Sequence, residues 1–209
     1  VSLGASVVTQ AVNGEFSAAI GRDGAIAFGS DFSLAPGLAY IVNMPEATSF
    51  TLEGLPLGAS VANTLLTAPA LQPDGVAPWM FAVGVELAAD TTVPTDVRMN
   101  VQNLRTGETA EAADLGAGRY GVTFISDERD GVAREGDELS LELVTREGYR
   151  LDARRLRRVT QADGAYASAI VTMDARPRTT QLLANYPNPF NPETWIPFTL
   201  TSASEATVR

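Results

Sequence analysis

The sequence predicts an all-β chain built around a β-sandwich, and three observations lead to that prediction. Apolar and polar residues alternate with a period of two along most of the 209 residues, as they do in half-buried strands. Gly, Asp and Pro interrupt these runs roughly every 8–12 residues, a spacing typical of sandwiches and barrels rather than of βαβ units. Hydrophobic residues make up 45% of the chain and Cys is absent, so packing rather than disulfides must hold the fold together.

Residues 1–70 are expected to form a small β module that ends in a Pro/Ala-rich connector. Strands are predicted at Gly14–Ile20, Ala39–Val42 and Thr48–Leu52, because each run alternates between turn-forming residues. The stretch from residue 55 to residue 76 is rich in Pro, Ala and Leu and shows no alternation. It is therefore interpreted as a connecting segment.

Residues 71–175 are expected to form an immunoglobulin-like β-sandwich. Trp79–Leu87 is long and apolar, which is the pattern of a central strand buried on both faces. Further strands are predicted at residues 97–103, 110–115, 119–125, 138–144, 151–159 and 167–173. Seven short strands in about 100 residues are typical of such a sandwich, although the Cys pair of antibody domains is absent. Residues 176–184 are interpreted as a linker, and residues 185–209 as the incomplete start of a second β-sandwich.

The residue types present exclude several chemistries. Cys, His and Lys are all absent, and all 15 basic residues are Arg. Without His there is no Ser-His-Asp triad and no His-ligated zinc, and without Lys there is no P-loop. The net charge of −10 disfavours a nucleic-acid partner, and no run approaches the roughly 18 apolar residues of a transmembrane helix. We therefore expect a chain that is not an enzyme, binds no nucleic acid and has no transmembrane segment.

Acidic residues gather on both sides of Gly131, namely Asp127, Glu128, Asp130, Glu135, Asp137 and Glu138. Paired carboxylates are the catalytic groups of glycosidases, and several loop oxygens are what calcium requires. Asp127 and Asp130 are the best calcium candidates, although their spacing is not that of an EF-hand loop and Arg129 and Arg134 partly neutralise the segment. Charged turns are expected between strands anyway, so solvated turn charges are the preferred interpretation. Structural calcium is the one cofactor that remains as an alternative.

Three further patterns have both a structural and a functional interpretation. Gly116–Gly121 matches the G-x-G-x-x-G of dinucleotide-binding loops, but a strand is predicted after it instead of a helix, which favours a hairpin turn. Arg154–Arg158 carries four Arg in five residues, either as a contact for polyanions or acidic glycans, as a protease-sensitive site, or as a solvated edge strand, which is preferred. Trp79, Tyr40 and Tyr149 either stack on sugar rings or pack in the core, and core packing is preferred.

The most specific motif of the chain begins at Asn185. Its residues are Asn185, Tyr186, Pro187, Asn188, Pro189, Phe190, Asn191, Pro192, Glu193, Thr194 and Trp195. Each Pro fixes φ and removes a donor, which holds the segment extended. The Asn side chains are suited to cap neighbouring backbone groups, and Phe190 and Trp195 are expected to anchor the turn in a small core.

This motif closely resembles the opening of the C-terminal sorting domains of type IX-secreted bacterial proteins, which reads L-x-N-Y-P-N-P-F-N-P-x-T and continues into strands. A looser resemblance links Phe32–Val42 to a β module that precedes such tails in multidomain surface proteins. Val101–Gly107, Gly121–Phe124 and Val132–Leu139 resemble the immunoglobulin-like domain beside that module. The resemblance implies an extracellular or cell-surface location. Through the tail it also implies a partner in the secretion and cell-surface attachment machinery.

Residues and resemblance together predict a non-catalytic structural or adhesive segment of a secreted bacterial surface protein. The tail is interpreted as the start of a secretion and anchoring signal, and a protein or glycan at the surface is a further expected partner. In the alternative interpretation, these are accessory domains, binding glycan or calcium, of a longer secreted enzyme whose catalytic domain lies upstream. Both ends look cut, so an internal segment of a longer protein is expected.

Overall fold

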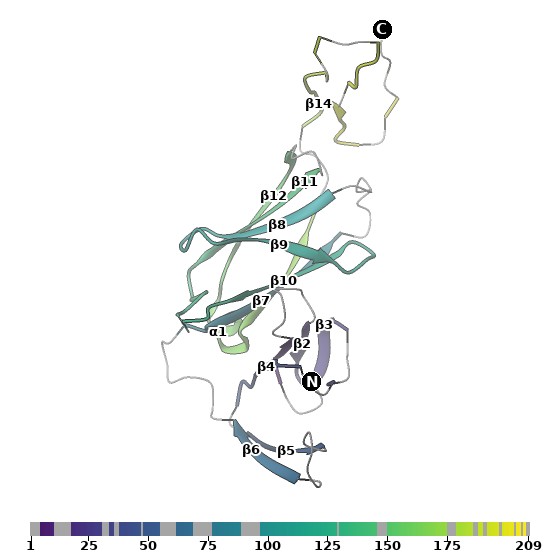
Figure 1. Cartoon of the computed structure of the whole chain (residues 1–209). Coiled ribbons are helices and arrows are strands. Elements are labelled where there is room, and N and C mark those ends of the chain that lie inside the picture. The colour runs from purple at the N-terminus through teal and green to yellow at the C-terminus, as the bar shows by residue number, and fades with distance from the viewer. Residues whose placement is uncertain are drawn as a thin grey trace.

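The computed structural model of the chain consists almost entirely of β-strands and the loops between them (Figure 1). The residues that it describes are 5–10, 18–30, 34–35, 38–46, 48–54, 62–68, 77–88, 97–128, 130–145, 150–174, 179–185, 188–189, 192–196, 198–202, 204–205 and 207. Within these residues the prediction of an all-β, sandwich-like chain is confirmed.

A small antiparallel sheet forms first. Its strands are β1 (Val7–Gln10), β2 (Ala18–Arg22), β3 (Ala25–Gly29) and β4 (Tyr40–Asn43), in the spatial order β3-β2-β1-β4. The tight turn between β2 and β3 places Asp23 and Gly24 at positive φ, 51° and 79°, as a two-residue hairpin loop requires. One face of this sheet carries Val7, Ile20 and Phe28, which are all fully buried.

A separate hairpin corrects the interpretation of residues 55–76 as a connector. Strand β5 (Thr48–Gly54) pairs with β6 (Ala62–Ala68) in antiparallel register, with Phe50 opposite Leu66. The run Ala62–Ala68 lacks alternation. Alternation arises when one face of a strand is buried and the other is in solvent, and backbone hydrogen bonding to a neighbouring strand does not require it. Residues 55–61 and 69–76 lie outside the described residues.

Seven strands form the main body. They are β7 (Met80–Leu87), β8 (Val97–Asn103), β9 (Thr109–Asp114), β10 (Arg119–Ile125), β11 (Glu138–Thr145), β12 (Arg150–Arg158) and β13 (Ser168–Met173). Their order is β12-β11-β8-β9-β10-β7-β13, and every pair is antiparallel except β7 and β13.

Strand β9 makes a sandwich out of this one continuous sheet. Its residues 109–112 pair with β8, whereas Ala113 and Asp114 pair with β10. One layer therefore holds β12, β11, β8 and the start of β9, and the other holds the end of β9, β10, β7 and β13. An immunoglobulin domain divides its strands differently, with the first, second, fourth and fifth in one layer. Strand count and alternation, on which the prediction was based, do not determine which strands pair.

The space between the two layers is filled by the larger core. Its fully buried members include Phe81, Val83, Met99, Val101, Leu139, Leu141 and Leu143. These residues come from β7, β8 and β11, of which β8 and β11 alternate inward and outward as half-buried strands should.

Strand β7 is buried on both faces, which confirms the prediction for this segment. Phe81, Val83 and Val85 point into the larger core. Met80 and Ala82 point the other way, into a second core that also contains the buried face of the small sheet. The small sheet is thus a third layer on the outer face of β10, β7 and β13.

One short helix, α1 (Gln161–Tyr166), stands between β12 and β13 and was not predicted. Thr160 caps it in a capping box, in which the Thr160 hydroxyl accepts from the Asp163 N–H and the Asp163 carboxylate accepts from the Thr160 N–H. The sequence signal was Thr-x-x-Asp, a variant of the capping-box pattern. The apolar periodicity of a longer helix is absent here, so the sequence gives no strong signal for a helix.

The C-terminal part contains β14 (Gln181–Leu182) and β15 (Phe198–Thr199), which pair with each other. Residues 181 and 182 were expected in the linker 176–184, so the structured tail begins earlier than the predicted boundary. The Thr199 hydroxyl also donates to the Thr179 carbonyl over 3.0 Å. In the part of the chain described, no helix is long and apolar enough to cross a membrane.

Two leucines on neighbouring strands test the layer assignment. Leu141 on β11 is fully buried, whereas Leu156 on β12 is 51% exposed. Leu141→Ala is expected to lower the free energy of unfolding by about 3 kcal/mol, because it removes core contacts and leaves a cavity. Leu156→Ala should cost less than about 1 kcal/mol. Urea denaturation measures both, and equal losses would contradict the assignment of Leu156 to the solvent-exposed face.

Candidate functional site

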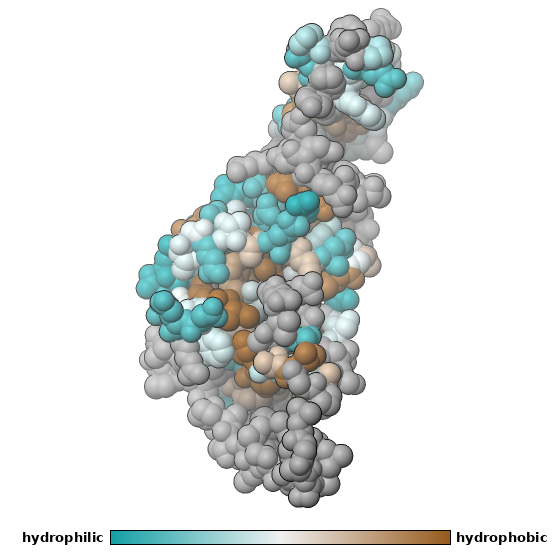
Figure 2. Space-filling model, in the orientation of Figure 1, coloured by the Kyte–Doolittle hydropathy of each residue, from teal (hydrophilic) through white to brown (hydrophobic). Residues whose placement is uncertain are grey.

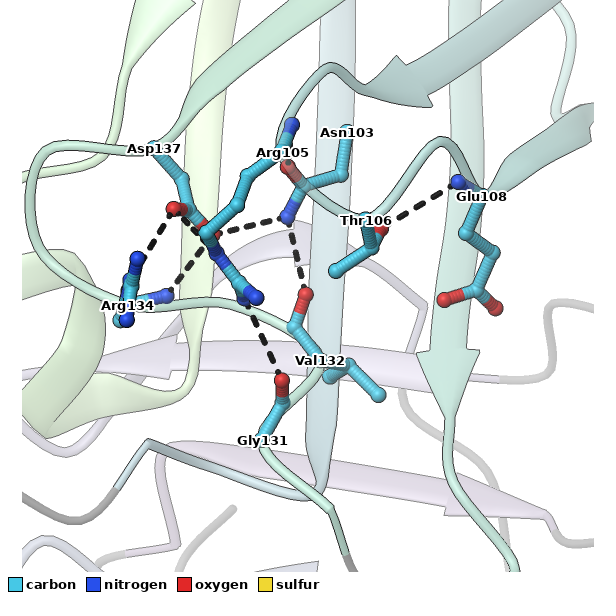
Figure 3. A network of polar contacts seen from close by, with 8 residues as sticks. All are labelled: Asn103, Arg105, Thr106, Glu108, Gly131, Val132, Arg134 and Asp137. Atoms are coloured by element: carbon cyan, nitrogen blue, oxygen red, sulfur yellow. Dashed lines mark hydrogen bonds and ion pairs between the residues drawn. The ribbon is translucent and has the colours of Figure 1, made fainter.

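The densest polar network of the sandwich surrounds Asp137 (Figure 3). This carboxylate is almost fully buried. Its Oδ1 accepts from Arg105 Nε over 2.7 Å, and its Oδ2 accepts from Asn103 Nδ2 over 2.9 Å and from the Arg134 N–H over 3.2 Å. Arg134 Nε also lies 3.6 Å from Oδ1. Every oxygen of this acid therefore has at least one donor.

The network joins segments that are far apart in sequence. Asn103 ends β8, Arg105 lies in the turn after it, and Asp137 immediately precedes β11. Asn103 Nδ2 donates to the Val132 carbonyl over 2.9 Å, and Arg105 Nη2 donates to the Gly131 carbonyl over 3.3 Å. The loop before β11 is thereby fastened to the β8–β9 turn. We conclude that Asp137 has a structural role.

The electrostatics of Asp137 follow from these contacts. Burial by itself would raise the pKa of its carboxyl group. The hydrogen bonds from Arg105, Asn103 and the Arg134 backbone, together with the charge of Arg105, outweigh burial and hold the pKa below its ordinary value. An acid that stays ionised and accepts several hydrogen bonds is poorly suited to proton transfer near neutral pH.

The other acids considered for catalysis or metal binding lie in exposed positions. Asp127 and Asp130, the calcium candidates, are exposed in the turn after β10, where the Asp130 N–H donates to the Ser126 hydroxyl over 3.1 Å. Glu128, Glu135 and Glu138 are exposed as well. Among the residues that the structure describes, no group of three or more His, Cys, Asp or Glu side chains is arranged to hold a metal ion. Residue 129 lies outside that set.

The glycine-rich pattern is a hairpin turn, as predicted. Gly116, Ala117 and Gly118 all have positive φ, and they connect β9 to β10. The Leu115 N–H donates to the Arg119 carbonyl over 2.8 Å, which closes the turn. A strand follows instead of a helix, so no helix N-terminus is available to a phosphate group.

The arginine-rich segment lies on β12, one of the two edge strands of the seven-stranded sheet, as the preferred interpretation predicts. Arg154 Nε donates to the Ser140 hydroxyl over 2.8 Å, and Arg157 Nη2 forms an ion pair with Asp163 at 2.8 Å. Glu138 stands opposite Arg158 in the β-ladder. The ion pair with Asp163, and Glu138 opposite Arg158, therefore offset part of this positive charge.

The three aromatic candidates have different outcomes. Trp79 is partly buried and packs against the second core, which agrees with the core-packing interpretation. Tyr40 is half-buried, and its hydroxyl accepts from the Ala35 N–H over 2.8 Å. Tyr149 lies outside the described residues.

One side-chain hydrogen bond connects the two ends of the tail motif. Asn185 Nδ2 donates to the Thr194 hydroxyl over 3.1 Å. This bond joins two side chains nine residues apart, so the expected capping of neighbouring backbone groups by the Asn residues stays a prediction. Asn188, Pro189, Pro192 and Glu193 are exposed. Tyr186, Pro187, Phe190 and Asn191 lie outside the described residues, so the expected anchoring role of Phe190 stays a prediction.

The expected anchoring role of Trp195 is wrong in this structure, because its side chain is 74% exposed. The physical reason is the size of the pairing: β14 and β15 have two residues each, too few to supply a covering layer. Leu182, Ile196 and Phe198 are also exposed large hydrophobic residues, and Leu182 stands opposite Phe198 in the ladder. The tail therefore presents apolar side chains to solvent.

Comparisons of the chain with protein-family models, with curated proteins and with solved structures gave no match.

Replacing Asp137 tests the polar network. Asp137→Asn is expected to lower the free energy of unfolding by about 2 kcal/mol at pH 7, because one buried oxygen becomes a donor that faces other donors. The folded-state pKa is depressed, so the stabilisation by Asp137 is present above the ordinary pKa of about 3.9 and is lost as pH falls below it. The difference between the two proteins should therefore be constant from pH 7 to about pH 5 and then shrink.

Asp130→Asn is the matched control, since Asp130 is exposed. It should change stability by less than about 0.5 kcal/mol at any of these pH values. Urea denaturation across the pH series measures both variants, and an Asp137→Asn loss no larger than that of the control would refute a stabilising network.

Trp195 gives a direct test of the tail. Trp195→Ala should change the free energy of unfolding by less than about 1 kcal/mol, because an exposed side chain leaves no cavity. In a Trp79→Phe background Trp195 is the sole tryptophan, and acrylamide should quench its fluorescence readily. A loss of about 3–5 kcal/mol, the range for a buried large aromatic, or strong protection from quenching, would show that Trp195 is covered.

Proposed function

We propose that this chain is a non-catalytic structural or adhesive segment of a secreted bacterial protein at the cell surface. Its C-terminal part, residues 185–209, acts in this proposal as the start of a secretion and anchoring tail. The observation that carries the proposal is the tail motif, Asn185 to Trp195, with Trp195 presented to solvent. A segment that is recognised by secretion and attachment machinery needs accessible side chains, and the exposed apolar residues of the tail meet that need.

The remainder of the chain supports a structural role. His, Cys and Lys are absent from the sequence, and the Asp137 carboxylate, the most buried among the residues that the structure describes, accepts three hydrogen bonds. The strands are packed into layers with two substantial cores. Such a body is suited to holding a position or spacing other domains, tasks that require rigidity but no reactive group.

A surface partner, protein or glycan, would meet the solvent face of β12, β11 and β8. Leu156 is exposed on this face, but polar and charged residues surround it. Arg98 forms an ion pair with Glu111 at 3.2 Å, and Arg154 donates a hydrogen bond to the Ser140 hydroxyl. Figure 2 shows hydrophilic side chains over much of the visible sandwich, with hydrophobic patches between them. The other outer face is covered by the small sheet.

Localisation of the native protein in the cells that make it tests the proposal. Cell fractionation and protease accessibility should find the protein at the surface or in the medium. Deletion of residues 185–195 should retain it in the cells, whereas Leu156→Ala, an exposed substitution in the sandwich, should leave secretion unchanged. Recovery of the unaltered protein only from the cytoplasmic fraction would overturn the proposal.

A further inference from the structure

The contact between the small sheet and the sandwich is a fitted one, centred on Phe28. The Phe28 side chain is fully buried although it belongs to the small sheet. Its ring lies directly over Gly84 of β7. A Cβ atom added to Gly84 would lie 2.6–2.9 Å from three ring carbons, closer than real Cβ contacts come. The ring therefore occupies the space that any other residue at position 84 would fill.

The sheet beneath Phe28 is shaped by small residues. Gly84 pairs with Gly121 of β10, and Gly121 pairs with Ala113 of β9, so three small residues stand side by side across the layer. Ala82, two residues before Gly84 on the same face, is also small and fully buried. This row forms a notch in an otherwise filled sheet surface. Large residues flank it, since Ile125 and Ile170 pack against the same core.

One arginine of the sandwich and one of the small sheet each reach across this contact and stabilise it. Arg119 of β10 places its guanidinium carbon 4.8 Å from the centroid of the Phe28 ring, and its Nη2 donates to the Gly29 carbonyl over 3.4 Å. In the opposite direction, Arg22 of β2 donates from Nη2 to the Ser168 carbonyl over 3.0 Å. Arg22 also lies 4.3 Å from the centroid of the Tyr166 ring. Both arginines thus combine a cation–π contact with a hydrogen bond to backbone.

From this contact we infer that the small sheet is an obligate third layer of the sandwich, with Phe28 in the Gly84 notch as its lock. The strands β1 to β4 and β7 to β13 then unfold as one cooperative unit and are not two independent domains. The second core supports this because it is built from both parts, Val7, Ile20 and Phe28 on one side and Met80 and Ala82 on the other. Separation would expose all of these side chains to water at once.

Native-state hydrogen exchange on the full chain tests cooperativity. The perturbation is Leu141→Ala, because Leu141 belongs to the larger core and not to the second one. It should raise the opening equilibrium of the sandwich amides, such as that of Val122, by at least about thirty-fold. If the small sheet is an obligate layer, the amide of Ile20 should show the same rise. An unchanged Ile20 amide beside a faster Val122 amide would overturn the inference.

Substitution of Gly84 tests the lock. Gly84→Ala places a methyl group against the Phe28 ring, and exchange in both the small sheet and the sandwich should accelerate together. Gly164→Ala in α1 is the matched control, because a Cβ there meets nothing within 4 Å. It should accelerate exchange in neither region, since Ala is the better helix former.

A double substitution shows whether Gly84→Ala destabilises the protein through the Phe28 ring or through some other effect at position 84. Phe28→Ala removes the ring that the new methyl group meets, so adding Gly84→Ala to Phe28→Ala should increase opening by less than about three-fold. In the wild-type background the same Gly84→Ala change should exceed roughly ten-fold, a difference that measures coupling between the two sites. Equal effects of Gly84→Ala with and without Phe28 would show that the ring is not the lock.

Discussion

The burial of β7 on both faces is the constraint on which the rest of the structure depends. Its residues Phe81, Val83 and Val85 belong to one core, and Met80 and Ala82 belong to the other. Its two neighbours, β10 and β13, must then also carry apolar residues on both sides, and Ile125 and Ile170 do so on the outer face. A strand in this position has no solvent face, so it reads as one continuous apolar run. The small sheet is held in place because this strand requires a cover.

Many of the strands could be predicted from the sequence, but which strands and side chains lie next to one another could not. The run Trp79–Leu87 shows by itself that both faces are buried, and alternation locates β8, β10, β11 and β13. Gly84, by contrast, is only a weak position within a strand until Phe28 is known to lie over it. The pairing of β9 with both β8 and β10 is equally hard to predict, since it depends on the relative position of two layers and not on any local pattern. Local sequence encodes burial and turns more directly than it encodes long-range neighbours.

The candidate site shows the same limit for polar residues. Six acids flank Gly131 and look alike in sequence, yet only Asp137 is drawn inside, because Asn103 and Arg105 of a distant turn supply its donors. The prediction of solvated turn charges therefore agrees with the exposed Asp127 and Asp130 and is wrong for Asp137. At the tail, Trp195 was expected in a small core since large aromatics are usually buried. Two-residue strands give it nothing to pack against, and no pattern within the motif reveals how much covering surface the surrounding chain provides.

The use of Arg as the sole basic residue has a structural consequence that unites these features. Arg22 stacks on Tyr166, Arg119 stacks on Phe28, and Arg105 donates to both Asp137 and the Gly131 carbonyl. Each contact uses the planar, multiply donating guanidinium, and a Lys ammonium would reproduce the charge without the stacking or the paired donors. Three of the basic groups thus connect layers or loops, in a chain whose net charge is −10. Acidic side chains such as Glu128 and Glu135 lie on the surface, where charge favours solubility, whereas these arginines hold neighbouring parts of the fold together.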